Sequence, residues 1–196
     1  MHAWLCENPV GVEALNWKQL PTPTPGPGQV LIEIQAASLN FPDLLIVQNK
    51  YQMKPELPFV PGSEYAGVVQ ALGEGVKHLQ VGQTVACLSG TGGFGTHTLA
   101  PAKLCMPLPA GFSAVDGAAF IMTYATSHHA LVDRAALKAG ETVLVLGAAG
   151  GVGTAAIQIA KAMGAKVIAA ASTDEKCALC TSLGADATIN YSRENL

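Results

Sequence analysis

Apolar and polar residues alternate in short runs over the first part of the chain. From Val30 to Gln35 every second residue is a valine or isoleucine, which is the pattern of a strand with one buried face. The proline- and glycine-rich stretch 21–28 before it excludes a helix or a central strand. Further short runs between glycine-rich turns are also predicted to be strands: 65–72, 84–88 and 96–100. Strands at this spacing indicate a small barrel-like β domain.

The period of the pattern changes near position 115. An alanine-rich stretch with helical spacing, 117–137, precedes a continuous apolar run at 142–147 that is typical of a strand buried on both faces. The next predicted elements are a helix over 152–163, a strand over 166–171, a helix over 174–183 and a strand over 187–190. This strand–helix–strand–helix–strand order is one mononucleotide-binding half of a doubly wound sheet. We therefore expect an α/β chain with two domains, 1–116 and 117–196.

Composition and charge narrow the classes of function. Hydrophobic residues make up 49% and charged residues 13% of the 196, so the chain can bury a sizeable core and is not of the disordered class. A net charge of −3 without a basic run argues against a nucleic-acid or anionic-membrane partner. The glycine-broken apolar stretch 142–160 is a poor membrane span. The acidic N-terminal stretch does not resemble a targeting peptide, and the five scattered cysteines indicate reduced thiols, so a cytoplasmic protein is expected.

A glycine-rich loop joins the first strand of the second part to the helix after it. Gly150 allows a backbone approach to a pyrophosphate, and Gly153 allows the helix to pack closely on the strand. The free N–H groups near Gly151 and Val152 would point at the anion. Ala148 stands at the first position of the usual three-glycine fingerprint, so the match is imperfect. The alternative is a tight strand–helix turn without a ligand.

The tip of the second strand of this part bears on the choice of nucleotide. An acidic residue there would bind a ribose 2′-hydroxyl, but the sequence continues with Ser172, which can donate to a 2′-phosphate. Lys176 lies one turn into the next helix, so NADPH is favoured over NADH, although Asp174 and Glu175 are nearby acids. A local role is also open, because Ser172 could cap the helix and Glu175 could complete a capping box.

Three separated motifs resemble the zinc-independent quinone oxidoreductases of the medium-chain dehydrogenase/reductase superfamily. They are Asn40-Phe41-Pro42-Asp43, the run from Phe59 to Val69, and the run from Ala148 to Gly153. The resemblance covers the whole chain in register. It implies an N-terminal GroES-like β domain followed by the first (βαβαβ) half of a Rossmann doubly wound parallel sheet. It also implies a cofactor in the cleft between the two domains, and a Rossmann domain incomplete at its C-terminus.

The resemblance also bears on metal binding. Zinc-dependent relatives carry a cysteine where this chain has Asn40 and a histidine where it has Ser63, and four closely spaced cysteines for a structural zinc do not occur. Glu64 alone cannot hold zinc, and we expect a buried, hydrogen-bonded structural carboxylate. No metal is predicted. The Cys177-x-x-Cys180 motif lies inside a predicted helix without further ligands, so a redox or metal role is not expected.

Site residues follow from the resemblance, position by position. It assigns a cofactor-binding group consisting of Ala149, Gly150, Gly151, Val152, Gly153, Ser172, Lys176 and Tyr191. It assigns a group beside the nicotinamide and the substrate consisting of Asn40, Tyr51 and Thr126. From the residues alone, packing or surface roles are favoured for Tyr51, Thr126 and Tyr191.

The expected function is hydride transfer from NADPH to a quinone or similar conjugated carbonyl, without zinc. Reduction of an enone or enoyl-thioester C=C bond needs the same hydride geometry, and Tyr51 could then donate the proton. A dinucleotide-binding fragment without turnover is a third hypothesis, because the sequence shows no second mononucleotide half and leaves the strand from Thr142 at a sheet edge. The expected partner is a small-molecule acceptor, and family analogy suggests a homodimer.

Overall fold

The computed structural model describes residues 1–194 and divides into two compact units, Met1–Ile121 and Met122–Leu196. The division lies a few residues beyond the predicted boundary at 116. Helix α2 (Ala114–Ala118) belongs to the first unit, because its residue Gly117 packs against that unit and leaves no space for a side chain. A Cβ on Gly117 would lie 2.7 Å from the Leu108 side chain.

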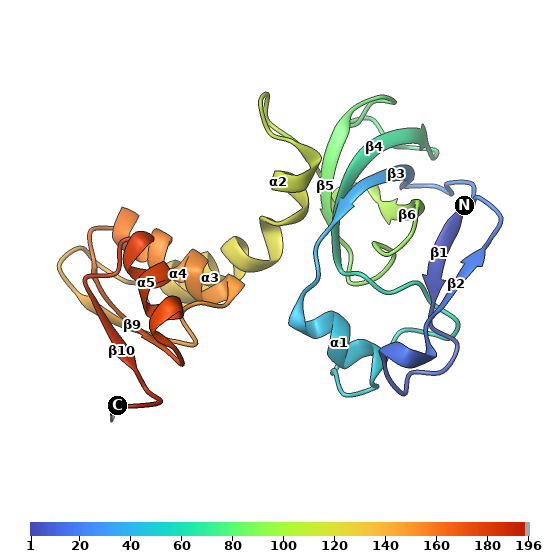
Figure 1. The fold of residues 1–196 in the computed structure, drawn as a ribbon. Coiled ribbons are helices and arrows are strands. Elements are labelled where there is room, and N and C mark those ends of the chain that lie inside the picture. The colour runs from blue at the N-terminus through green and yellow to red at the C-terminus, as the bar shows by residue number, and fades with distance from the viewer. Residues whose placement is uncertain (195–196) are drawn as a thin grey trace. The chain divides into compact units, whose positions relative to one another are not determined.

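The first unit contains a five-stranded antiparallel sheet in the order β6-β3-β4-β5-β7 (Figure 1). Its strands are β3 (Gln29–Ala37), β4 (Glu64–Leu72), β5 (Thr84–Leu88), β6 (His97–Pro101) and β7 (Cys105–Pro107). The alternating residues Val30 and Ile32 of β3 are fully buried with Tyr65 and Val69 of β4 in one core. The four strands predicted from alternation are confirmed, with ends shifted by one or two residues.

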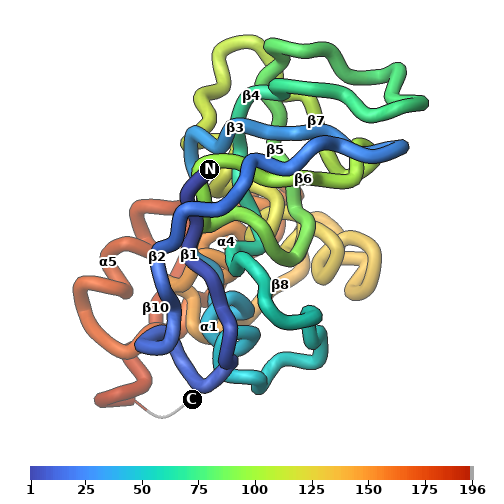
Figure 2. Tube along the Cα trace, turned by 90° about the vertical axis from the view of Figure 1, so that its right-hand side faces the viewer, coloured from blue at the N-terminus to red at the C-terminus, as the bar shows by residue number. Residues whose placement is uncertain are grey.

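Sequence periodicity missed the shortest elements of this unit. Strands β1 (His2–Leu5) and β2 (Asn16–Gln19) pair antiparallel and lie side by side in both views (Figures 1 and 2). Each has four residues and β2 is largely exposed, so neither carries a clear apolar alternation. Helix α1 (Phe41–Val47) spans under two turns and begins after Asn40, its N-cap. Short 3₁₀ turns at Val12–Ala14 and Ala102–Leu104 complete the connections.

The second unit contains a three-stranded parallel sheet in the order β10-β9-β8, and helices connect the strands. The elements are β8 (Thr142–Leu146), α4 (Gly151–Ala162), β9 (Lys166–Ala171), α5 (Asp174–Ser182) and β10 (Ala187–Asn190). Strands β9 and β10 have the predicted ends. The β-α-β-α-β half of a Rossmann sheet and the α/β fold class are thereby confirmed.

Strand β8 differs from its prediction in one respect. It lies at the edge of the sheet, as expected, but it is not buried on both faces. Val145 packs in the core with Ile157 of α4 and Val167 of β9. Leu144 and Leu146 point to the opposite face and are 51% and 64% exposed. Within residues 1–194, one face of β8 is therefore covered by the core and the other face is open, although both carry apolar side chains.

The predicted helix over 117–137 is interrupted rather than continuous. After α2 the chain forms a π-helical turn at Ile121–Ala125, one turn of α3 (Thr126–His128) and a second π-helical segment at His129–Arg134. Within residues 1–194, none of the helices combines the length and apolarity that a membrane crossing requires.

Candidate cofactor-binding site

The glycine loop makes a tight turn between β8 and α4. Gly147 has a φ of 61°, in the left-handed region that favours glycine. Its carbonyl accepts the N–H of Gly150 at 3.0 Å, and Gly150 is the N-cap of α4. Because the first N–H groups of a helix have no partner inside the helix, the start of α4 presents donors to an anion.

Two later glycines of this loop are required by packing. A Cβ on Gly153 would lie 2.7 Å from backbone atoms of Ala148, so any side chain there would separate α4 from the loop. This is the close helix–strand contact that the sequence predicts for Gly153. A Cβ on Gly151 would lie 2.9 Å from the methyl group of Thr123. Gly150, by contrast, has its nearest neighbour at 3.4 Å.

A cavity of about 150 Å³ lies where β8, β9 and β10 end. Its walls consist of Gly147, Ala149, Gly150, Ala171, Ser172, Lys176 and Tyr191. Most of the predicted cofactor residues thus meet at the carboxyl edge of the sheet, which is where open α/β sheets bind ligands. The Lys176 ammonium donates to the Ser172 hydroxyl at 3.1 Å, so a cation and a hydroxyl face one small space.

The predicted capping role of Ser172 is wrong. Thr173 is the N-cap of α5, and its hydroxyl accepts the backbone N–H of Lys176 at 3.3 Å. The helix begins one residue later than a Ser172 cap would require. Glu175 does not bond back to Ser172: hydrogen bonds from its own N–H and from Thr173 lower the pKa of its carboxyl. The Ser172 hydroxyl therefore remains on the cavity side with Lys176.

Asp174, an acid two residues after the cavity residue Ser172, is paired with polar and charged partners. Its carboxylate accepts the side-chain amide of Asn190 at 2.8 Å and pairs with the guanidinium of Arg193. Sequence reasoning counted Asp174 against a phosphate and overlooked Arg193. The available signal was the position of Arg193, two residues after Tyr191.

Thr126 and Val152 are close to the loop but do not line this cavity. Thr126 is exposed on α3. The hydroxyl of the next residue, buried Ser127, donates to the Val152 carbonyl at 2.8 Å and ties α3 to the first turn of α4. The interrupted helical segment thus supports the loop through Thr123 and Ser127.

The other predicted group lies in the first unit, at the start of α1. The side-chain amide of Asn40 donates to the Ser38 hydroxyl at 2.8 Å and to the Glu64 carboxylate at 3.2 Å. Ser38 also donates to the same Glu64 oxygen at 2.7 Å. Glu64 is fully buried, which confirms the expected structural carboxylate. Tyr51, half-buried, lies beyond the opposite end of α1 from Asn40.

Asp43 completes this polar cluster. Its carboxylate accepts the backbone N–H of Asn40 at 2.8 Å, the N–H of Ser63 at 2.9 Å and the Ser63 hydroxyl. The donor set does not fit zinc. The cluster offers two carboxylates, an amide and two hydroxyls where His and Cys ligands are usual, and these groups already bond one another. Among residues 1–194 no group of three or more His, Cys, Asp or Glu could hold a metal ion.

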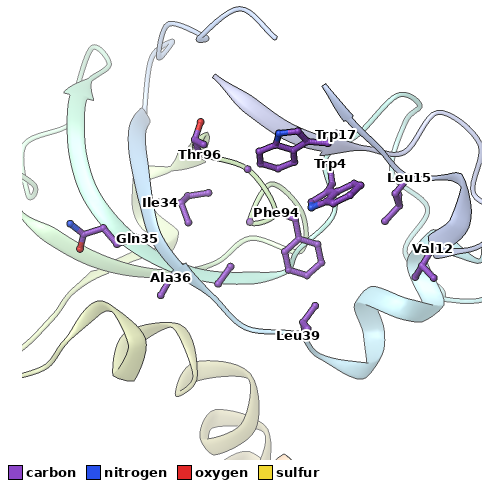
Figure 3. Close-up of a pocket in the computed structure, with 13 residues that line it drawn as sticks. Trp4, Val12, Leu15, Trp17, Ile34, Gln35, Ala36, Leu39, Phe94 and Thr96 are labelled. Carbon is purple, nitrogen blue, oxygen red and sulfur yellow. The ribbon is translucent and has the colours of Figure 1, made fainter. Parts of the chain in front are cut away.

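A larger cavity, of about 630 Å³, lies elsewhere in the first unit. Figure 3 shows the rings of Trp4, Trp17 and Phe94 around it, with Leu39 on the segment before α1. Its lining is largely apolar and includes none of the predicted site residues. Sequence reasoning missed this cavity because its aromatic residues come from separate elements.

Comparisons with known proteins agree with this architecture. The family model described as the alcohol dehydrogenase GroES-like domain matches residues 26–110, and the one described as zinc-binding dehydrogenase matches 151–196. Quinone oxidoreductase-like protein 2 of Bos taurus is 40% identical over 177 residues, which are 89% of this chain and 51% of that protein. The chain thus spans about half the length of this relative.

Solved structures are similar over nearly the whole chain. The quinone oxidoreductase of Thermus thermophilus, described with its NADPH complex, has a TM-score of 0.86 and 38% identity, covering 98% of this chain and 60% of that one. A mycobacterial protein complexed with NADPH has a TM-score of 0.92 and 35% identity, covering 99% and 60%.

Proposed function

Because the chain belongs to the quinone oxidoreductase family of the medium-chain dehydrogenase/reductase superfamily, we propose that it takes part in an enzymatic reduction. The proposed reaction is the NADPH-dependent reduction of a quinone or similar conjugated carbonyl. The relatives extend well beyond the region that it matches, so the proposal concerns the activity of the complete protein. The observation that carries it is the pairing of Lys176 with Ser172 in the cavity at the carboxyl ends of the strands.

The residues around this cavity fit a 2′-phosphorylated dinucleotide. Lys176 supplies a positive charge and Ser172 a hydroxyl donor, which together suit a phosphate. Asp174, which would repel that phosphate, is held by Arg193 and Asn190. The exposed ring of Tyr191 forms one wall and can pack on the adenosine.

The loop and the start of α4 fit the pyrophosphate. Ala149, Gly151 and Val152 place backbone N–H groups at or beside a helix N-terminus, where an anion is stabilised by the helix dipole. Gly150, whose own N–H bonds the Gly147 carbonyl, leaves space for the pyrophosphate. Gly153 keeps the helix close enough to the strand for this arrangement. NADPH, when bound, supplies the hydride. The protein's part is to bind and orient the cofactor.

For the acceptor side the family resemblance alone supports Asn40, Tyr51 and Thr126. Hydrogen bonds from Asn40 to Ser38 and Glu64 hold its amide in one orientation. We propose that the reaction needs no zinc, because this cluster stabilises itself through its own hydrogen bonds. A small-molecule acceptor, a homodimer and a cytoplasmic location, the last favoured by five free cysteines, complete the proposal.

The first test is a fluorescence titration of the chain with NADPH and with NADH. We expect NADPH to bind more tightly, and Lys176→Ala to weaken NADPH about tenfold, because one charge-assisted contact contributes about 1.4 kcal/mol. NADH should be little affected. Lys166→Ala is the matched control, since Lys166 is exposed at the opposite end of β9 from Ser172. Equal affinity for both nucleotides would contradict the NADPH preference.

Turnover is tested separately on the complete protein. Quinones and enones are compared as acceptors in an NADPH oxidation assay. Faster oxidation with quinones supports the proposed acceptor. Exclusive reduction of an enone C=C bond, lost in Tyr51→Phe, would replace it with the alternative reductase.

A further inference from the structure

Two buried cysteines of the first unit stand opposite each other on neighbouring strands. Cys87 of β5 is the register partner of Cys105 of β7. Cys87 is fully buried and Cys105 is 4% exposed, and both belong to the core that contains Tyr65. The proposed function uses neither residue. Both thiols are free.

The register gives this pair the geometry that a cross-link needs. The backbone N–H of Leu108 donates to the carbonyl of Thr84, its opposite residue, at 3.0 Å. Hydrogen-bonded and non-hydrogen-bonded pairs alternate along an antiparallel ladder. Cys87 lies three positions after Thr84 on β5, so the Cys87–Cys105 pair is of the non-hydrogen-bonded type. Such pairs have Cα atoms about 4.5 Å apart, within the range of about 4.4–6.8 Å found in disulfides.

The two thiols differ in acidity. The interaction with Cys105, whose thiol also donates to the Pro101 carbonyl at 3.5 Å, has the largest effect and lowers the pKa of Cys87. Tyr65 and Ser89 lower it further, and together these three effects outweigh burial. The interaction with Cys87, followed by burial, raises the pKa of Cys105. Tyr65 is also the register partner of Cys87 on β4, so its hydroxyl lies in the same row across the sheet. The lower pKa favours Cys87 as the nucleophile, and the register places Cys105 directly opposite it as the second thiol.

From this geometry we infer that Cys87 and Cys105 are a site of reversible oxidative modification, at which a peroxide converts the two thiols to a cross-strand disulfide. The Cys87 thiolate attacks one peroxide oxygen, the O–O bond breaks, and Cys87 becomes a sulfenic acid. The Cys105 sulfur then attacks the Cys87 sulfur, and the S–O bond breaks with loss of water. Two thiols and one hydrogen peroxide yield one disulfide and two waters, and a dithiol reductant reverses the change.

Access to the buried pair is through β7. This strand has three residues and lies at the edge of the sheet, so it can open locally without unfolding of the other strands. The disulfide would then join β7 covalently to β5. This inference is independent of the proposed function.

The test treats the full chain, reduced and folded, with hydrogen peroxide. We expect maleimide titration in denaturant to fall from five thiols to three, and peptide mapping to find Cys87 joined to Cys105. A dithiol should restore five, and the thermal midpoint followed by tryptophan fluorescence should rise on oxidation, because both tryptophans lie in the first unit.

Variants separate the two steps. Cys105→Ser should leave a sulfenic acid on Cys87 that a 1,3-diketone probe traps, and Cys87→Ser should lose the reaction. The Cys177→Ser/Cys180→Ser double variant is the matched control, because it removes the other buried close pair and should still form the cross-link. The inference is overturned if the folded wild-type chain keeps five thiols, if mapping finds another pair, or if cross-linking requires denaturant.

Discussion

Each unit contains a polar cluster around residues that the sequence assigned to the site, Asn40 in the first unit and Ser172 and Lys176 in the second. The two clusters differ in how their hydrogen-bonding groups are used. Around Asp43 in the first unit, the donors and acceptors bond one another and are buried or half-buried. Around Lys176 in the second unit, a cation, a hydroxyl and a tyrosine ring surround an accessible cavity.

The difference separates a supporting cluster from a binding cluster. Groups that are already paired inside the protein stabilise its own fold, since breaking such bonds leaves buried polar atoms unpaired. Groups that face a cavity can exchange their few internal bonds for bonds to a ligand. Substitutions in the Asp43 cluster should therefore lower the stability of the first unit, and substitutions in the Lys176 cluster should weaken nucleotide binding.

The largest expected effect is that of Gly153→Val. Its side chain would collide with Ala148 and force α4 away from the loop, so we expect the second unit to lose about 2–3 kcal/mol of stability and NADPH binding to be abolished. Far-UV circular dichroism in urea measures the loss. Tryptophan fluorescence, which reports only on the first unit, should remain unchanged.

Gly150→Ala is the control for this prediction. A Cβ there has its nearest neighbour at 3.4 Å, so the fold should be retained while the approach of a pyrophosphate is hindered. Equal destabilisation by both substitutions would show that the close contact at Gly153 is not what holds α4.

Asp43→Ala should have the next largest effect, on the other cluster. It leaves the N–H groups of Asn40 and Ser63 without their acceptor, so we expect a loss of about 2 kcal/mol in the first unit. Urea unfolding followed by tryptophan fluorescence measures it, and NADPH affinity should stay within twofold of the wild type if the clusters are independent. A large fall in affinity would break the distinction between them.

Thr173→Ala and Ser172→Ala distinguish a helix-capping residue from a ligand-binding residue within the second unit. Removing the N-cap hydroxyl of Thr173 should cost about 1 kcal/mol of stability. Removing the Ser172 hydroxyl should leave stability nearly unchanged and weaken NADPH binding. The reverse pattern would restore Ser172 as the cap and remove it from the proposed phosphate site.

The smallest expected effect concerns Asp186. Its pKa is lowered by hydrogen bonds from Lys161 and from the Val167 N–H, so the carboxylate stabilises the fold above its unfolded pKa. This contribution is lost as the pH falls through the lower folded pKa. The stability difference between wild type and Asp186→Asn should thus be constant near neutrality and shrink in acid. A difference unchanged at acid pH would contradict this assignment.

The second unit could be read from the sequence in more detail than the first. Strands β9 and β10 and the glycine loop depend on contiguous residues and on local rules for glycine and parallel strands. In the first unit, β1, β2 and α1 are too short for periodicity to reveal. The side chains that meet at Asp43 come from positions some twenty residues apart, so only folding shows that they bond one another.

Sequence pattern alone was enough to predict strands β3 to β6, the β-α-β-α-β half-sheet and the residues of the glycine loop, because each follows from local pattern and backbone geometry. The folded chain was needed to show that Thr173 caps α5, that Arg193 pairs with Asp174 and that Cys87 lies opposite Cys105. These contacts depend on the strand registers and helix connections that bring residues distant in the sequence within hydrogen-bonding distance. One local pattern of residues is compatible with several registers, so the pattern alone does not specify the contacts.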